Sequence, residues 1–262
     1  MPRFAANLSL LFTELPLVDR IAAAADAGFE AVEMQIPYEA DPELLANQLQ
    51  KHKQHLVLFN ICPGNAGEAG LACHPNRTDE FREALEKGTR YADALRPDCV
   101  HLLAGYMPQG VTPEVMDATF VDNVRLAART LAPLGVTVNL EALNQVAMPG
   151  YLFNTQSRSA YFVELINEPN VGMQFDCFHC QMQEGYVSAR LQRYLPLIRH
   201  IQIAGAPERH EPDTGELRYE YLFDLIDRIG YTGYVGCEYM PAGSTEEGLE
   251  WFRDYLSWSQ TD

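Results

Sequence analysis

Four acidic or amide side chains stand singly within apolar segments in the second half of the chain. They are Glu141 in NLEAL, Asp176 in QFDCF, Gln202 in HIQIA and Glu238 in GCEYM. Unpaired carboxylates are costly to bury, and few cationic residues lie near these four in the sequence. A bound divalent metal ion would offset their mutual repulsion. Three carboxylates and one amide oxygen form a hard ligand set, which suits Mg²⁺ or Mn²⁺ better than Zn²⁺.

The segment QFDCFHCQ, residues 174–181, allows three interpretations. Cys177 and Cys180 form a C-x-x-C, which is typical of a redox pair or half a zinc site. Asp176 and His179 form a D-x-x-H, which would supply oxygen and nitrogen ligands to another metal. The third interpretation is a buried strand. The other four cysteines are scattered singly, which disfavours a functional dithiol, and strand alternation would turn His179 away from Asp176 unless the strand ends or bulges there.

Eight β-rich segments alternate with amphipathic segments along the chain. Several are nearly continuous in apolar residues, as parallel strands covered on both faces are. The expected strands begin at Arg3, Ala31, His55, Cys99, Val136, Val171, Arg199 and Tyr234. Asp41 and Thr112, each followed by proline, are expected to cap helices, and Ser244 to Glu247 has capping-box spacing before the last helix.

Eight strand–helix units in 262 residues predict an α/β fold, a single (β/α)₈ TIM barrel over residues 1–262. A doubly wound sheet is the alternative, but it usually has fewer strands, and Asn7-Leu8-Ser9 stands where a glycine-rich dinucleotide motif would follow the first strand. A barrel gathers its active site at the C-terminal ends of its strands. We therefore expect the four residues of the hard ligand set to converge there. Other polar residues expected along these strands are Glu33, Gln35, Asn60 and, at the start of the fourth strand, His101.

Composition restricts the partners of the chain. Lys and Arg number 19 against 36 Asp and Glu, which gives a formal net charge of -17 that would repel nucleic acid and anionic membranes. No apolar run is long enough to span a bilayer, and the first twelve residues are typical of a strand rather than a signal peptide. Six scattered cysteines favour a reduced, cytoplasmic setting over a disulfide framework.

Over nearly its whole length the chain resembles the hydroxypyruvate isomerase family of xylose-isomerase-like barrels. The resemblance is carried by RFAANLSLLF, FNICPG with AGEAGLA, NLEALN, QFDCFHCQ, HIQIAGAPERHEPDTGELRY and GCEYMP. Within the family, RFAANLS and IAGAPERHEPD resemble the 2-oxo-tetronate isomerase branch most closely. The loop of residues 63–70 departs from that branch, because it is shorter and has Asn65 where aspartate is common.

The resemblance implies a role for each candidate residue. Glu141, Asp176, Gln202 and Glu238 match the metal-binding positions of the family. Glu141 and Glu238 also match its two proton-transfer residues, and His179 matches a substrate-contacting histidine.

A cationic side chain is expected to bind an acidic substrate. The candidates are Arg209 and His210, in the loop after the seventh strand, and Arg209 is favoured because its guanidinium suits bidentate contact with a carboxylate. Arg209 also stands where the resemblance places a substrate-binding arginine. The alternative is that Arg209 pairs with Glu208 or Glu211 at the surface. His101 either lines the substrate pocket or is a hydrogen-bonded core histidine.

The implied reaction moves a carbonyl between adjacent carbons of a small hydroxy-oxo acid, here 2-dehydrotetronate to 3-dehydrotetronate, through an enediolate. Glu141 or Glu238 would remove a carbon-bound proton, and either could return one to the next carbon. The alternatives are hydroxypyruvate isomerase, a ketose 3-epimerase, an inactive sugar-acid-binding protein and a metal-dependent phosphodiesterase. The last needs a basic groove and a histidine-rich cluster, which this chain does not offer. We expect a small-molecule sugar acid as partner, no nucleic acid or membrane, and possible homo-oligomers.

Overall fold

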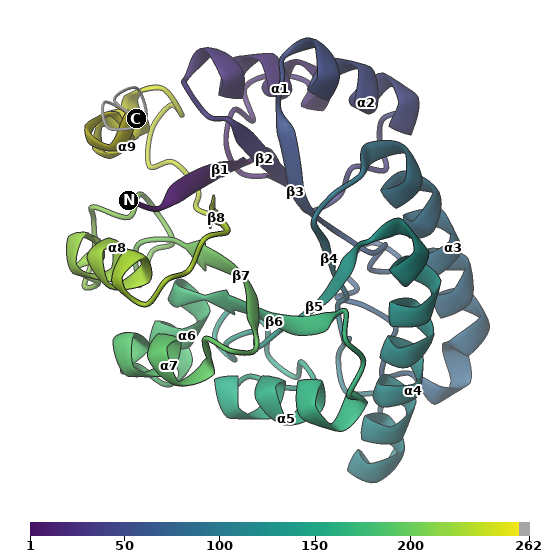
Figure 1. Cartoon of the computed structure of the whole chain (residues 1–262). Coiled ribbons are helices and arrows are strands. Elements are labelled where there is room, and N and C mark those ends of the chain that lie inside the picture. The colour runs from purple at the N-terminus through teal and green to yellow at the C-terminus, as the bar shows by residue number, and fades with distance from the viewer. Residues whose placement is uncertain (257–262) are drawn as a thin grey trace.

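The computed structural model describes residues 1–256, which fold around eight parallel strands that close into a barrel (Figure 1). The strands are β1 (Arg3–Asn7), β2 (Ala31–Met34), β3 (His55–Asn60), β4 (Cys99–His101), β5 (Thr137–Glu141), β6 (Val171–Asp176), β7 (Ile198–Ile203) and β8 (Tyr234–Cys237). Each strand pairs with its neighbours in chain order, and β1 pairs with β8 to close the barrel. The predicted TIM barrel is confirmed. The predicted single domain extends over residues 257–262, which lie outside the described residues, and it stays a prediction.

Helices surround the barrel and connect successive strands (Figure 1). They are α1 (Leu17–Asp26), α2 (Pro42–Lys51), α3 (Thr78–Leu95), α4 (Pro113–Leu131), α5 (Gln156–Ile166), α6 (Cys177–Gln183), α7 (Val187–Tyr194), α8 (Tyr219–Arg228) and α9 (Glu250–Leu256), with 3₁₀ turns η1 (Pro75–Arg77), η2 (Ala132–Leu134) and η3 (Glu247–Leu249). Within residues 1–256, none of these helices combines the length and the apolar character needed to cross a membrane.

The predicted helix caps meet different outcomes. Asp41 caps α2 as predicted, because its carboxylate accepts from the backbone N–H of Glu43 and Leu44. Thr112 stands at the start of α4, but its side chain makes no capping hydrogen bond. The predicted capping box before α9 is wrong: the Ser244 hydroxyl donates to the side chain of Glu247, and α9 begins only after the turn η3.

The core between barrel and helices also closes the seam where the first and last strands meet. Phe4 on β1 packs edge-to-face against Phe223 of α8 and Trp251 of α9, with ring centroids 5.0 and 5.3 Å apart. Each is buried, and burial of such a side chain stabilises a fold by about 1.5–3 kcal/mol. These contacts pack β1 against α8 and α9.

Two strand ends differ from the prediction. His101 is the last residue of β4 rather than a residue at the start of a longer strand, so its side chain lies near the C-terminal edge of the barrel. β6 ends at Asp176, and α6 begins at the next residue. His179 therefore follows Asp176 by three residues on a helix, and the alternation of a strand does not apply to it. Cys180 lies past the end of the strand, on α6.

Loops at the C-terminal edge of the barrel pair with one another. Isolated antiparallel bridges join Gly70 to Ala104 and Tyr106 to Tyr151, and so connect the loops after β3, β4 and β5. Gly70 has a φ of +107°, and a Cβ there would lie 2.1 Å from the carbonyl oxygen of Leu103. Only glycine fits this close approach.

Candidate active site

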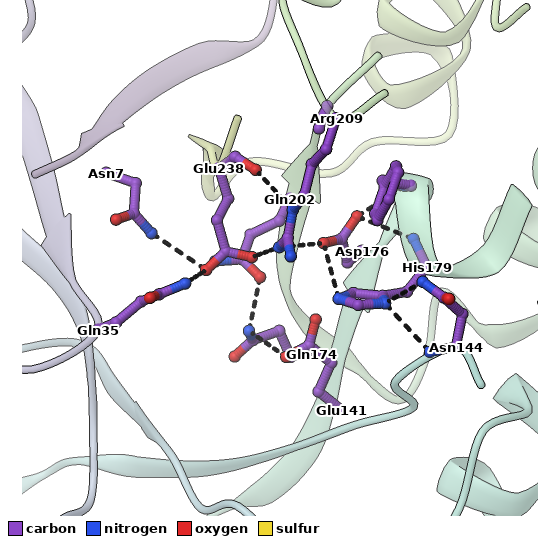
Figure 2. Close-up of polar contacts among 12 residues, drawn as sticks. Asn7, Gln35, Glu141, Asn144, Gln174, Asp176, His179, Gln202, Arg209 and Glu238 are labelled. Atoms are coloured by element: carbon purple, nitrogen blue, oxygen red, sulfur yellow. Dashed lines mark hydrogen bonds and ion pairs between the residues drawn. The ribbon is translucent and has the colours of Figure 1, made fainter. Parts of the chain in front are cut away.

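The four residues of the predicted hard ligand set converge at the C-terminal edge of the barrel (Figure 2). Glu141 and Asp176 are the last residues of β5 and β6, Gln202 lies on β7, and Glu238 directly follows β8. All four are at most 5% exposed. The strand-end rule thus placed these residues correctly, while their roles in binding and catalysis stay predictions.

Glu238 is held by donors from three other segments. Its Oε1 accepts from Gln35 Nε2 at 2.7 Å and from Asn7 Nδ2 at 3.2 Å. Its Oε2 accepts from Arg209 Nη2 at 2.6 Å. Burial raises the pKa of the Glu238 carboxyl to about 7, and the adjacent Arg209 guanidinium partly offsets that rise.

Glu141 and Asp176 each have one buried oxygen without a hydrogen-bond partner. Glu141 Oε2 accepts from Gln174 Nε2 at 3.0 Å and lies 3.3 Å from His101 Nδ1, whereas its Oε1 has no donor. Asp176 Oδ1 caps α6, accepting from the backbone N–H of Phe178 and His179, and its Oδ2 has no donor within hydrogen-bond distance. Burial raises the pKa of both carboxyl groups. Two such oxygens form a place where a cation would stabilise buried negative charge.

Glu141, Asp176 and His179 each present one ligand-type atom, and these atoms lie within 4.8 Å of one another. The His179 ring differs from the carboxylates in what it can offer. Its Nδ1 accepts from the backbone N–H of Asn144 at 3.1 Å, and burial lowers its pKa well below the usual value, so the ring is neutral. The ring proton is then on Nε2, which lies 3.8 Å from Asp176 Oδ2 and faces the site as a donor. The residues therefore fit a cation that prefers oxygen ligands.

Arg209 reaches the site from the loop after β7. Its Nη2 lies 3.6 Å from Asp176 Oδ2 as well as bonding Glu238, and its guanidinium stacks over the Phe178 ring at 5.0 Å. The carboxylate of Glu211 instead accepts from the backbone N–H of Ala242. The sequence left open that Arg209 pairs with Glu208 or Glu211 at the surface. In the structure it pairs with Asp176 and Glu238 in the site instead.

His101 is buried, and its Nδ1 lies 3.3 Å from Glu141 Oε2. Burial, followed by the neighbouring His200, lowers its pKa to about 3, so the ring is neutral. Its predicted substrate contact stays a prediction, and the structure places its Nδ1 beside the Glu141 carboxylate.

Two amide side chains complete the network and were not predicted. Gln174 donates to both Glu141 Oε2 and Gln202 Oε1, the latter at 2.6 Å, and so joins two of the strand-end residues. Asn7, at the end of β1, donates to Glu238. Gln174 stands two residues before Asp176 in QFD, so strand alternation already put both on one face of the strand.

The fold and site define a class: a (β/α)₈ barrel protein with buried carboxylates gathered at the ends of its strands. Residues 21–255 match the sequence model of a family described as xylose isomerase-like TIM barrel. The chain belongs to this family.

Full-length relatives are named isomerases. The chain is 45% identical to the 2-oxo-tetronate isomerase of Cupriavidus necator over 258 residues, which cover 98% of this chain and 99% of that protein. It is 38% identical to the hydroxypyruvate isomerase of Escherichia coli, with 97% and 100% covered. The predicted resemblance is confirmed, and these names bear out the prediction that the chain is an isomerase.

Solved structures agree with the fold. A Brucella melitensis protein described as an AP endonuclease of family 2 is 44% identical and superposes with a TM-score of 0.95, covering 97% of this chain and 99% of that one. A D-psicose 3-epimerase from Clostridium cellulolyticum gives 0.80 at 18% identity, with 98% and 99% covered. The second comparison shows the fold alone.

Proposed function

We propose that the chain is a metal-assisted isomerase of a small hydroxy-oxo acid, and that it converts 2-dehydrotetronate to 3-dehydrotetronate. The observation that carries this proposal is that Glu141 and Asp176 each have a buried oxygen without a hydrogen-bond partner, that of Asp176 lying 3.6 Å from Arg209 Nη2. The relatives named 2-oxo-tetronate isomerase, at 42–45% identity, support the choice of substrate. Relatives named hydroxypyruvate isomerase make that acid the second candidate.

The reaction requires proton transfer at two neighbouring carbons. A base removes the proton from C3, which leaves an enediolate across C2 and C3. A proton is then added at C2, and the hydroxyl proton passes from O3 to O2, so the carbonyl has moved by one carbon. Glu141 and Glu238, from strands that are not neighbours in the barrel, are the two carboxylates that could carry these protons.

The ligand set of Glu141, Asp176, Gln202 and Glu238 suits Mg²⁺ or Mn²⁺, which when bound would stabilise negative charge on the substrate oxygens. Arg209 would bind the substrate carboxylate, because a guanidinium can contact both of its oxygens. His179 would donate its Nε2 proton to a substrate oxygen, as its tautomer allows.

Assays on the purified protein with Mn²⁺ test this function. The substrates are 2-oxo-tetronates, hydroxypyruvate, a neutral ketose, and DNA with an abasic site. We expect the highest kcat/KM for a 2-oxo-tetronate and no DNA cleavage, since a net charge of -17 disfavours nucleic acid. Asp176→Asn removes the charge of one proposed metal ligand at nearly the same side-chain size, and this control variant should lose activity. Turnover of the neutral ketose comparable to that of the 2-oxo-tetronate would contradict the proposal of an acidic substrate. Cleavage of the DNA would indicate a phosphodiesterase instead of an isomerase.

A further inference from the structure

Glu33 on β2 is a fully buried carboxylate that the proposed reaction does not use. It accepts three hydrogen bonds from side chains of other strands. His200 Nε2 donates to its Oε2 at 2.7 Å, while Gln202 Nε2 and Asn7 Nδ2 donate to its Oε1 at 2.8 and 2.9 Å. The donors come from β7 and β1, so the carboxylate ties together segments far apart in the sequence.

A carboxylate can only accept, and this decides how the amide of Gln202 is turned. Gln202 must present its NH₂ group to Glu33, so its carbonyl oxygen points the other way, where it accepts from Gln174 Nε2. Gln174 donates in turn to Glu141. If Glu33 did not accept, the Gln202 amide could rotate and present hydrogen atoms, rather than an oxygen, to a cation.

Asn7 is turned by the same carboxylate. Its Nδ2 donates both to Glu33 and to Glu238, and its Oδ1 accepts from the backbone N–H of Ser9 at 3.0 Å. The Asn7 amide is therefore held from both ends. Glu33 thus contacts one residue of the ligand set directly, Gln202, and a second, Glu238, through one amide.

Gly236 on β8 leaves the space that the Glu33 carboxylate fills. A Cβ at Gly236 would lie 2.3 Å from Glu33 Oε2 and 2.5 Å from Oε1, closer than such atoms approach. Gly236 is also in register with Gln202 on β7. The backbone therefore admits the carboxylate directly beside the amide that it turns.

We propose that Glu33 is a positioning residue, which holds the amide oxygen of Gln202 toward the bound cation and steadies Glu238 through Asn7. The inference rests on the proposed metal site, because it assigns Glu33 a task only if Gln202 is a ligand. It adds that the site depends on a carboxylate that touches neither metal nor substrate.

Three variants separate orientation from charge and from packing. Glu33→Met has a similar length but accepts nothing. Glu33→Gln keeps an oxygen for Gln202 and Asn7, and its NH₂ can donate to His200 in the other neutral tautomer. Glu33→Asp keeps the charge on a side chain that is one methylene shorter. It is the variant to measure if Glu33→Met does not fold.

Two measurements are made on each variant. Calorimetry without substrate gives the affinity for Mn²⁺, and NMR of the metal-free protein gives hydrogen-exchange protection of the Gln202 side-chain amide, assigned with Gln202→Leu. Circular dichroism checks folding.

We expect Glu33→Met to bind Mn²⁺ about 10- to 100-fold more weakly, because removing a residue that orients a metal ligand typically has this effect. We also expect it to lose the protection of the Gln202 side-chain amide. Glu33→Asp should lose part of both, and Glu33→Gln should retain most of both.

The inference is overturned if a folded Glu33→Met, or Glu33→Asp where the first does not fold, matches the parent in both measurements. It is also overturned if Glu33→Gln loses as much as Glu33→Met, since charge rather than orientation would then be the cause. A parent protein that does not bind Mn²⁺ would contradict the proposed function instead. Amide protection in the metal-free protein would still decide whether Glu33 turns Gln202.

Discussion

Arg209 donates a 2.6 Å hydrogen bond to Glu238 from a backbone position with a φ of +60°, which is uncommon for any residue but glycine. Two backbone hydrogen bonds hold that conformation: Arg209 N–H donates to the carbonyl of Gly205, and Met240 N–H donates to the carbonyl of Arg209. The loops after β7 and β8 therefore cooperate to direct a guanidinium at the strand-end carboxylates. The positive charge of Arg209 is therefore fixed in the site by the backbone of these two loops.

Replacement of Arg209 should separate acidic from neutral substrates. We expect Arg209→Gln to lower kcat/KM for the acid by about 10- to 100-fold, because a hydrogen bond to a charged group contributes about 1.5–3 kcal/mol. Arg209→Lys keeps the charge without the bidentate geometry and should lose less. Steady-state kinetics on an acid and on a neutral ketose measure this. An equal loss for both substrates would mean that Arg209 acts only through Glu238.

Replacement of each proton-transfer candidate should identify the base. Glu141→Gln and Glu238→Gln should each lower kcat by about 10²- to 10⁴-fold. In D₂O, the variant that retains the base should still exchange the C3 hydrogen of the substrate with solvent, and the other variant should not. NMR of the recovered substrate detects this exchange. Isomerisation near the parent rate in both variants would contradict the assignment of either residue.

Replacement of the C-x-x-C thiols should leave metal binding intact. Burial raises the pKa of the Cys177 thiol well above its usual value and that of Cys180 to about 12, so both stay protonated and are poor ligands. We expect Cys177→Ala and Cys180→Ala to bind Mn²⁺ as the parent does, with unfolding free energies lower by about 1 kcal/mol. Metal loss in either variant, with Asp176 unchanged, would restore the cysteine site as an explanation.

The loop of residues 63–70 should become less stable in acid. Hydrogen bonds from Arg77 and then from the backbone N–H of Asn65 lower the pKa of Glu68 from 4.5 to about 2. Because the folded pKa is the lower one, this stability is present above about pH 4.5 and is lost as the pH falls toward 2. Glu68→Gln should lower the unfolding free energy by about 1 kcal/mol at pH 7, and most of this difference from the parent should be lost by pH 2. Urea unfolding across this pH range measures the difference, and a constant one would contradict the ion pair as its cause.

The strands and the gathering of carboxylates could be predicted because both depend on local pattern. Apolar runs such as the one around Asp176 predict buried parallel strands, and the barrel then brings their ends together. The end of β6 could not be predicted in this way, since QFDCFH is as apolar on the helix side of Asp176 as on the strand side. If the strand continued past Asp176, His179 would face away from the site. Because α6 begins directly after Asp176, the His179 side chain lies in the site instead.

The amide network could not be predicted, because its members are distant in sequence. Glu33 and Gln202 are 169 residues apart and meet across the barrel interior. No periodicity links the two, and the direction of each hydrogen bond depends on which neighbour can only accept. The sequence therefore identified the strand-end residues but not what orients them.

The bridges from Gly70 to Ala104 and from Tyr106 to Tyr151 bear on how this barrel could be re-engineered. Transplanting one rim loop from a relative would leave its partner's backbone amides and carbonyls unmatched, which is costly. The loops after β3, β4 and β5 should therefore be exchanged as one cassette. The loops after β7 and β8 are joined by the hydrogen bond from Met240 N–H to the carbonyl of Arg209 and form a second cassette, so these five loops would change substrate range as coupled blocks rather than one at a time.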